Sequence, residues 1–191
     1  MYDENDQVDR QTPVPPAPVG IGEGYRATPC FLYVSGLRLI LMDLLTASLF
    51  EQYWFYRNWR YLRDRDKLDI SPFWRTWFNI FFIHELFRRM REDPQLEPAG
   101  RGPSPASWHA TLWIVMTLAS GVLSRIPTNN APLFGGILGL SSFFCLLPAQ
   151  RFVNRANAAQ VPRPKTSPWT GWQYALLVVG IIINVVFFMA P

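Results

Sequence analysis

Residues 169–190 read WTGWQYALLVVGIIINVVFFMA, and no charged residue occurs in this stretch or after it, since the last one in the chain is Lys165. At about 1.5 Å per residue, a helix of this length crosses a hydrocarbon core of about 30 Å. A charged side chain at the centre of a bilayer is costly, so an uncharged run of this length indicates a transmembrane helix. The sequence therefore predicts an integral membrane protein.

The residue composition supports the same class of protein. Hydrophobic residues make up 49% of the 191-residue chain, an ordinary share, but they are grouped into long segments while arginine and lysine cluster between them. The chain is rich in tryptophan and tyrosine, which favour the membrane–water interface. Retention on the cytoplasmic side and attraction to anionic lipid account for the net charge of +4. We expect a lipid bilayer as partner and no nucleic acid.

The first long apolar segment, residues 31–59, has a core from Leu37 to Tyr56 that is long enough to span a membrane as one helix. Asp43 and Glu51 fall on one side of this helix, which should face other helices or a water-filled space rather than lipid. In a second interpretation only Asp43 is buried, and Glu51 lies at the level of the lipid headgroups. The segment predicts the first spanning helix of an N-terminal unit, residues 30–91.

Aromatic and basic residues alternate directly after this segment, as in the aromatic belts and basic collars of membrane proteins. Ser71 and Pro72 then predict the start of another helix, which continues to Met90. Its apolar positions do not form a single stripe, so we expect an interfacial or re-entrant helix; a fifth spanning helix is the alternative. The candidate face for lipid or a protein partner comprises Trp54, Arg57, Trp59, Arg60, Arg63, Trp74 and Arg75.

The distribution of basic residues predicts the topology. If the 71–90 helix does not cross the membrane, residues 57–101 place ten basic residues on one side, and residues 149–168 add four on that side. Only four of the 18 lysines and arginines remain elsewhere. Because basic residues near membrane spans favour the cytoplasmic side, we expect four spanning helices, with the N-terminus outside and Pro98 in the cytoplasm.

Two polar stretches rich in proline and glycine divide the chain, a flexible arm at residues 1–29 and a linker at residues 92–107. Residues 108–191 then hold three spanning helices, of which the first two form a hairpin. Small residues on both arms of the hairpin allow close packing, either within the hairpin or in a homo-oligomer through Gly135 and Gly139. These residues are Thr117, Gly121 and Ser124 on the first arm and Gly135, Gly139 and Ser142 on the second.

Several amides could bind polar groups. Gln150, Asn154 and Asn157 share one helix face, where they can clamp another helix, a lipid headgroup or a polar substrate; the alternative is a solvated helix end. Asn184 lies within the last span and needs a partner, which a neighbouring helix would supply, although a role in a transport path is the alternative.

No catalytic constellation is evident in the sequence. The pair His84-Glu85 lacks the second histidine that a zinc-protease helix needs, and no glycine-rich phosphate loop occurs. Cys30 and Cys145 are far apart in sequence, and we expect both to be free thiols. We therefore expect no enzyme activity, metal or cofactor.

Three short motifs resemble a family of small bacterial membrane proteins of unknown function. TASLFEQYWFYRNW (residues 46–59) is similar to the T-x-G-[IL]-Y-x-x-Y-W-[FL]-Y signature that ends their first spanning helix, with Ser48 in place of the glycine and Phe50 in place of the first tyrosine. ISPFWR (residues 70–75) and the P-x-Q at residues 148–150, followed by spaced asparagines, also resemble that family. The resemblance implies a multi-pass protein of the bacterial inner membrane and no particular activity.

These features lead to two functional hypotheses. In the first, the protein is a non-enzymatic accessory component that binds a membrane protein or anionic lipid through its aromatic and basic cytoplasmic face. In the second, it is a small transporter or channel subunit, in which Asp43, Glu51, Asn184 and the amide row line a polar path. The expected fold is the same for both: an all-α, polytopic membrane protein with four spanning helices and an aromatic-rich interfacial or re-entrant helix.

Overall fold

The computed structural model describes residues 30–99, 106–128, 130–160 and 171–189. These residues form helices joined by turns and short connections, with no β-strand among them, so the all-α prediction is confirmed. The expected arm at residues 1–29 lies outside the described residues. Part of the expected linker is ordered as a short 3-10 helix, η1 (Pro94–Ala99).

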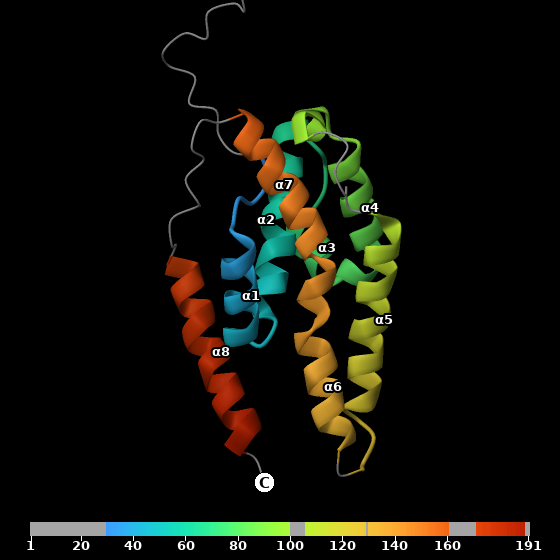
Figure 1. Ribbon diagram of the computed structural model, residues 1–191, viewed down its shortest axis with the longest axis vertical. Coiled ribbons are helices and arrows are strands. Elements are labelled where there is room, and N and C mark those ends of the chain that lie inside the picture. Colours follow the sequence, from blue (N-terminus) through green and yellow to red (C-terminus); the bar gives the residue numbers. More distant parts are fainter. Residues whose placement is uncertain (1–29, 100–105, 129, 161–170, 190–191) are drawn as a thin grey trace, which may run out of the picture.

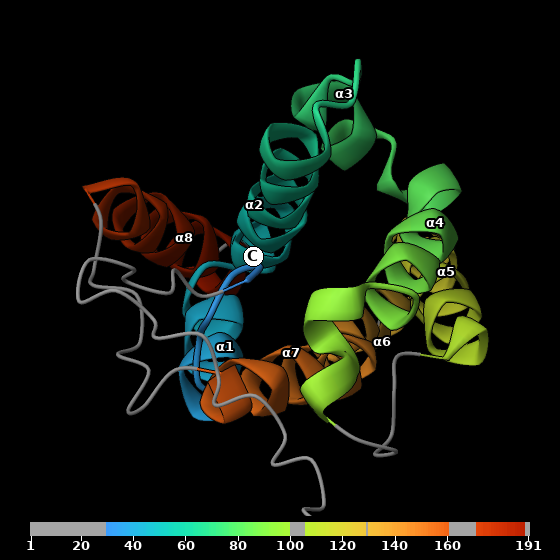
Figure 2. The same ribbon diagram turned by 90° about the horizontal axis from the view of Figure 1, so that it is seen from above.

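The helices run mostly along one long axis, which is vertical in Figure 1. Helices α2, α4 and α7 fill the upper half, whereas α5, α6 and α8 reach the lower end. Seen from above, α8 lies outside the other helices, and α3 lies at the periphery at the far end of α2 (Figure 2). The remaining elements are α1 (Gly36–Leu45), α2 (Leu49–Asp66), α3 (Pro72–Trp77), α4 (Asn79–Arg91), α5 (Ser107–Leu123), α6 (Ala131–Leu140), η2 (Ser142–Cys145), α7 (Leu147–Gln160) and α8 (Gly171–Met189).

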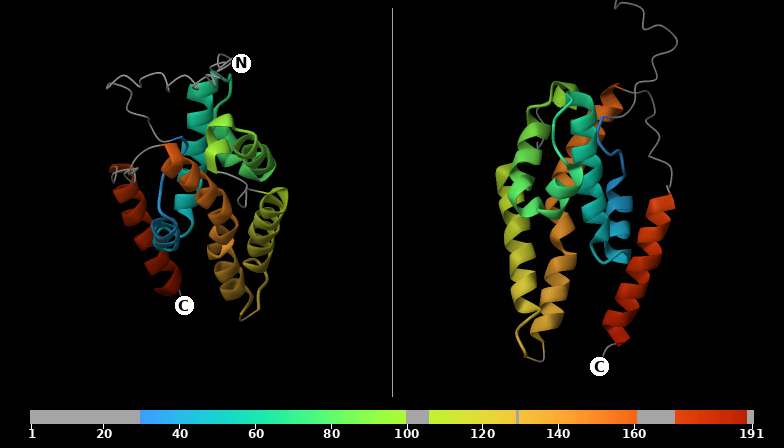
Figure 3. Two further views of the ribbon diagram at one scale, coloured as in Figure 1. Left: turned by 45° about the horizontal axis from the view of Figure 1, so that its top comes forward. Right: turned by 180° about the vertical axis from the view of Figure 1, so that it is seen from behind.

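The predicted single helix from Leu37 to Tyr56 is wrong. The chain reverses at Thr46–Ser48, where Ala47 (φ 48°) and Ser48 (φ 64°) adopt left-handed backbone conformations that cannot continue a helix. The Thr46 hydroxyl accepts a hydrogen bond from the Phe50 amide (2.9 Å) at the start of α2. Helices α1 and α2 therefore form a hairpin, whose turn lies above the lower ends of α8 and the α5–α6 pair (Figure 3).

Aromatic side chains dominate the core of the upper half. The indoles of Trp54, Trp59 and Trp113 are all at most 1% exposed. Phe55 packs edge-on against both Trp54 (5.3 Å between ring centroids) and Trp113 (5.4 Å), which ties α2 to α5. Burial of several large rings supplies much of the apolar area that stabilises the bundle.

Helices α5 and α6 form the predicted hairpin, and small residues line their contact. A Cβ atom on Gly135 would lie 2.5 Å from Ser124 Oγ, and one on Gly139 would lie 2.6 Å from Ser120 Oγ. The Ser120 hydroxyl donates a hydrogen bond to the Gly135 carbonyl (2.7 Å). The two glycines therefore pack within the hairpin, as in the first of the two interpretations, so an oligomer through them would have to displace α5.

One continuous helical segment, Ala131–Ala159, is long and apolar enough to cross a membrane, with a mean hydropathy of 1.7 over its most apolar window. It comprises α6, η2 and most of α7. Ser107–Leu123 and Gly171–Val186 are shorter apolar helices. Among the described residues, Ala131–Ala159 is the one segment that meets both criteria of length and hydropathy.

Helix α8 packs closely on the end of α1 through a glycine. A Cβ atom on Gly180 would lie 2.2 Å from Thr46 Cα and 2.7 Å from the Leu45 carbonyl oxygen. One turn further along, the Asn184 amide donates to the Leu45 carbonyl (3.3 Å) and to the Gly180 carbonyl (3.0 Å). The expectation that a neighbouring helix supplies a partner for Asn184 is thus confirmed.

We expect Gly180→Ala to weaken the contact between α8 and α1, because the added methyl group has no space and overpacking costs about 1–3 kcal/mol. The thermal unfolding midpoint in mild detergent should fall. Gly171→Ala is the matched control, because nothing lies within 4 Å of a Cβ at that position. Equal midpoints for the two variants would contradict the close approach of α8.

Candidate functional site

The structure separates the predicted aromatic and basic face into an inward and an outward set. Trp54 and Trp59 belong to the inward set, since both are 0% exposed. The Trp54 indole nitrogen donates a hydrogen bond to Gln150 Oε1 on α7 (2.6 Å). Neither tryptophan is available to a lipid or protein partner, so their assignment to that face is wrong.

Arg75 also points inward. Its guanidinium lies over the rings of Trp59 (4.6 Å to the centroid) and Phe82 (4.8 Å), and it pairs with Glu85 at 2.6 Å. Partial burial disfavours the charged form of Glu85, but hydrogen bonds from Arg89 and Arg75 outweigh this and lower its pKa. Arg75 therefore joins α3 to α2 and α4 rather than offering a charge to a partner.

The outward set keeps the other arginines. Arg57 and Arg60 are exposed on α2, and Arg63 is half-buried. Arg60 and Arg63 both contact Asp64, at 3.6 Å and 2.7 Å, and the hydrogen bond from Arg63 lowers the pKa of that carboxyl. Two guanidinium groups thus share a single carboxylate, and Arg57 lies over the Tyr53 ring instead, so this surface of α2 carries a net positive charge.

Exposed aromatic rings surround Trp74, the last member of the predicted face. We call this cluster the aromatic platform; its rings are 46–76% exposed and come from α3, the start of α4 and Phe78 between the two helices. Two pairs of rings stack within it, with centroids 6.2 Å and 5.9 Å apart. In water such a patch is unfavourable, so it indicates a contact with lipid or another apolar surface. The platform consists of Phe73, Trp74, Trp77, Phe78 and Phe81.

The amide row on α7 holds an extended segment of its own chain, residues 30–34. Asn157 binds both backbone groups of Cys30, accepting from the amide (2.8 Å) and donating to the carbonyl (2.9 Å). Gln150 donates to the Leu32 carbonyl (3.0 Å), and Asn154 donates to the Val34 carbonyl (2.8 Å). The row is therefore neither a solvated helix end nor a free site for a headgroup or substrate.

Asn58 on α2 completes this arrangement from the other side, and the sequence did not reveal it. Its side-chain oxygen accepts the Leu32 amide (3.0 Å), and its nitrogen donates to the Trp54 carbonyl one turn earlier (2.9 Å). We call these four amides (Asn58, Gln150, Asn154 and Asn157) the amide clamp. Together they provide hydrogen-bond partners for successive backbone amide and carbonyl groups of the segment, as a neighbouring β-strand would.

Both intramembrane candidates on the α1–α2 hairpin are buried. Asp43 is 0% exposed; its carboxyl group lies near the Ser48 side chain and the Glu51 backbone amide, although neither oxygen makes a hydrogen bond of normal geometry within the described residues. Glu51 is 4% exposed and accepts hydrogen bonds from the Ser142 hydroxyl (2.6 Å) and the Trp113 indole (3.2 Å). The interpretation in which only Asp43 is buried is therefore wrong.

Glu51 and Asn184 both line a cavity of about 330 Å³ between the α1–α2 turn, the α5–α6 hairpin and α8. The structure thus joins two of the three predicted intramembrane residues at one site, whereas Asp43 lies outside the lining. Ser142 was expected only as a small packing residue and Trp113 not at all, because a hydroxyl and an indole are common in apolar helices and nothing in their spacing points to Glu51. The lining residues are Ala47, Ser48, Glu51, Gln52, Trp113, Thr117, Ser120, Gly136, Gly139, Leu140, Ser142, Ile183 and Asn184.

The described residues include no group of three or more histidine, cysteine, aspartate or glutamate side chains placed to hold a metal ion. Cys30 and Cys145 are both buried free thiols, as expected.

No protein family, curated protein or solved structure matches this chain. Its geometry is therefore the basis for assigning a function.

We expect Asn157→Leu to open the amide clamp, because it leaves two backbone groups of Cys30 unpaired at about 1–3 kcal/mol each. Burial, followed by the charge of Asp93, raises the pKa of the Cys30 thiol to about 11, so this buried thiol should react slowly with maleimide at neutral pH. In a Cys145→Ser background, Asn157→Leu should accelerate the labelling. Asn130→Leu, at an exposed amide on the lower turn, should not.

Proposed function

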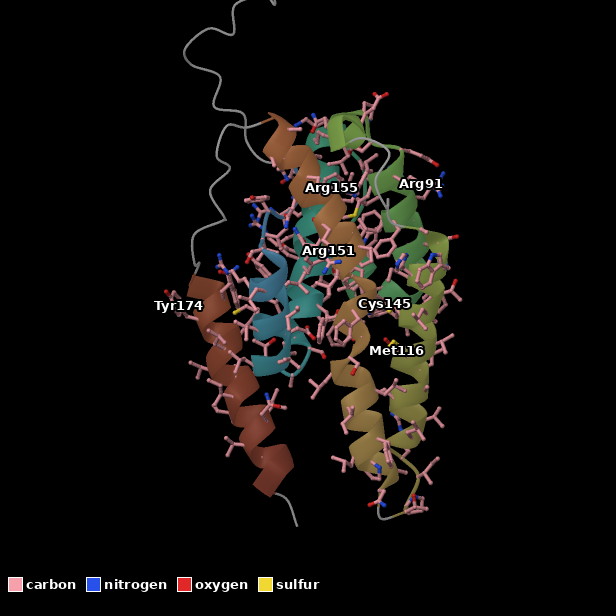
Figure 4. The ribbon with its side chains drawn as sticks, in the orientation of Figure 1. Arg91, Met116, Cys145, Arg151, Arg155 and Tyr174 are labelled. Carbon is pink, nitrogen blue, oxygen red and sulfur yellow. The ribbon has the colours of Figure 1, made fainter. Side chains whose placement is uncertain are left out.

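We propose that the protein is a multi-pass protein of the bacterial inner membrane. The main support is the segregation of side chains along the long axis. Arg91, Arg151 and Arg155 lie above the middle of the bundle (Figure 4), whereas the surfaces of α1, α5, α6 and α8 are largely apolar. Exposed apolar surface on this scale is rare in soluble monomers. It includes Leu37, Leu41, Leu44, Leu112, Val115, Leu118, Val122, Leu133, Phe134, Ile137, Val178, Val179, Ile181, Ile182, Val185 and Val186.

In this proposal three segments cross the membrane: α5, the α6–α7 segment and α8. Helix α5 has 17 residues and α8 has 19, which correspond to about 25 Å and 28 Å, close to the thickness of a bilayer core. The α1–α2 hairpin enters from the upper side and returns to it, because Leu32 pairs with Asn58 across the hairpin. The upper end, with most of the arginines, faces the cytoplasm.

The activity that we propose is the binding of anionic lipid at the cytoplasmic interface, as a non-enzymatic accessory component. The aromatic platform provides rings that suit the headgroup region, and the exposed Arg57 and Arg60 lie on α2, the helix that α3 contacts most. The combination of exposed rings and nearby unburied guanidinium groups carries this proposal. A lipid surface fits a broad platform at the periphery of the bundle better than a specific protein partner does.

The proposed topology can be tested with reporter fusions. A reporter inserted after Pro98 should be cytoplasmic and one at the C-terminus external. A reporter at the N-terminus should also be cytoplasmic, because α1 and α2 together do not cross the membrane. An external N-terminus would instead favour the four-span topology and contradict the re-entrant hairpin.

Lipid binding can be tested with paired arginine variants. Arg57→Gln/Arg60→Gln should lower the affinity of the purified protein for fluorescent phosphatidylglycerol in phosphatidylcholine nanodiscs by about fivefold per arginine, since a basic residue near the surface contributes about 1 kcal/mol. Arg88→Gln/Arg91→Gln is the matched control. These two exposed residues lie about 14–18 Å along α4 from Asn79, beyond a Debye length of about 8 Å. An equal loss in both pairs would refute a lipid site beside the platform.

A further inference from the structure

The cavity beside Glu51 is separate from the aromatic platform and has a chemistry of its own. Its one titratable lining residue is Glu51, and the described lining contains no basic residue. The other polar groups are hydroxyls and amides, contributed by Ser48, Thr117, Ser120 and Ser142 and by Gln52 and Asn184. The site therefore offers many hydrogen-bond acceptors and one group that can carry negative charge.

The environment of Glu51 favours a positively charged occupant. The carboxyl group is 4% exposed, and its two hydrogen bonds come from the neutral donors Ser142 and Trp113. A charge removed from water is costly unless a counter-charge lies nearby. Asp43 is also buried and lies close enough to Glu51 for the two carboxyl groups to interact, so a cation beside Glu51 would favour the ionised forms of both.

The size and the remaining lining of the cavity limit the kind of cation. A volume of about 330 Å³ is at the lower end of the range for small-molecule sites, about 300–1,000 Å³, and exceeds the space that a bare ion needs. Leu140, Ile183 and Ala47 also line the cavity and provide apolar surface. Gln52 and Ile183 are exposed, so the cavity has an open side.

We propose that this cavity binds a small organic ammonium group, with Glu51 as the counter-ion and the surrounding hydroxyl and amide oxygens as hydrogen-bond acceptors. A primary ammonium has three donors, which Glu51 and two hydroxyls can satisfy together. The apolar lining then contacts the carbon atoms of the ligand. The ammonium could belong to a soluble amine or to the headgroup of phosphatidylethanolamine, and the two share the same chemistry.

Isothermal titration of the full-length protein in phosphatidylglycerol nanodiscs tests this site. Ethanolamine should bind, and ethylene glycol, its uncharged analogue of nearly the same size, should not. Glu51→Gln keeps the shape of the side chain and removes the charge, so ethanolamine affinity should fall at least about tenfold. Glu97→Gln, at an exposed carboxyl on η1, is the matched control and should bind as the unaltered protein does.

A second variant covers the case in which Glu51→Gln does not fold. Thr117→Phe fills the cavity while leaving Glu51 in place, and it should also abolish ethanolamine binding. Loss of ethanolamine binding when phosphatidylethanolamine is added to the nanodiscs would support the site and identify the lipid headgroup as the source of the ammonium. Absence of ethanolamine binding, equal binding of ethylene glycol, or unchanged binding in a folded Glu51→Gln or Thr117→Phe variant would each overturn the proposal.

Discussion

The backbone of residues 30–34 is buried between two helices, and its polar groups need hydrogen-bond partners there. An unpaired buried amide or carbonyl costs as much as a lost hydrogen bond, and the part of the chain that the structure describes has no β-strand to pair with this segment. The amide clamp meets the requirement with side chains from α2 and α7. Because it fixes the chain immediately before α1, the clamp also sets the level at which α1 begins and thus the level of the α1–α2 turn.

The position of that turn determines what surrounds the two buried carboxyl groups. Since α1 ends after ten residues, its last carbonyls have no partner within the helix, and another element can bind them. Asn184 of α8 donates to the Leu44 and Leu45 carbonyls, and Gly180 allows α8 to come close enough to do so. The same turn leaves room below it for the cavity, so one reversal of the chain positions both Glu51 and α8.

The sequence predicted the helical class, the α5–α6 hairpin, the start of α3 at Ser71-Pro72, the free cysteines and the need of Asn184 for a partner. It did not predict the reversal at Ala47 and Ser48, because the apolar pattern continues through it and neither residue is a glycine, which adopts positive φ without strain. The predicted aromatic and basic face was based on the kinds of residue in this stretch and not on their positions around the helix. Helical spacing places the buried Trp54, Asn58 and Trp59 on one side of α2 and the exposed Arg57 and Arg60 on another.

The amide clamp also sets the order of events during biosynthesis. Asn157 and Cys30, which it joins, are 127 residues apart, so at about 5–20 residues per second the ribosome needs about 6–25 s to supply the second partner after the first. During that interval the carbonyl and amide groups of residues 30–34 have only Asn58 as a native partner from the clamp. The α1–α2 hairpin can therefore reach its final position only after α7 has been translated, and until then water has to solvate most of the polar backbone groups of residues 30–34.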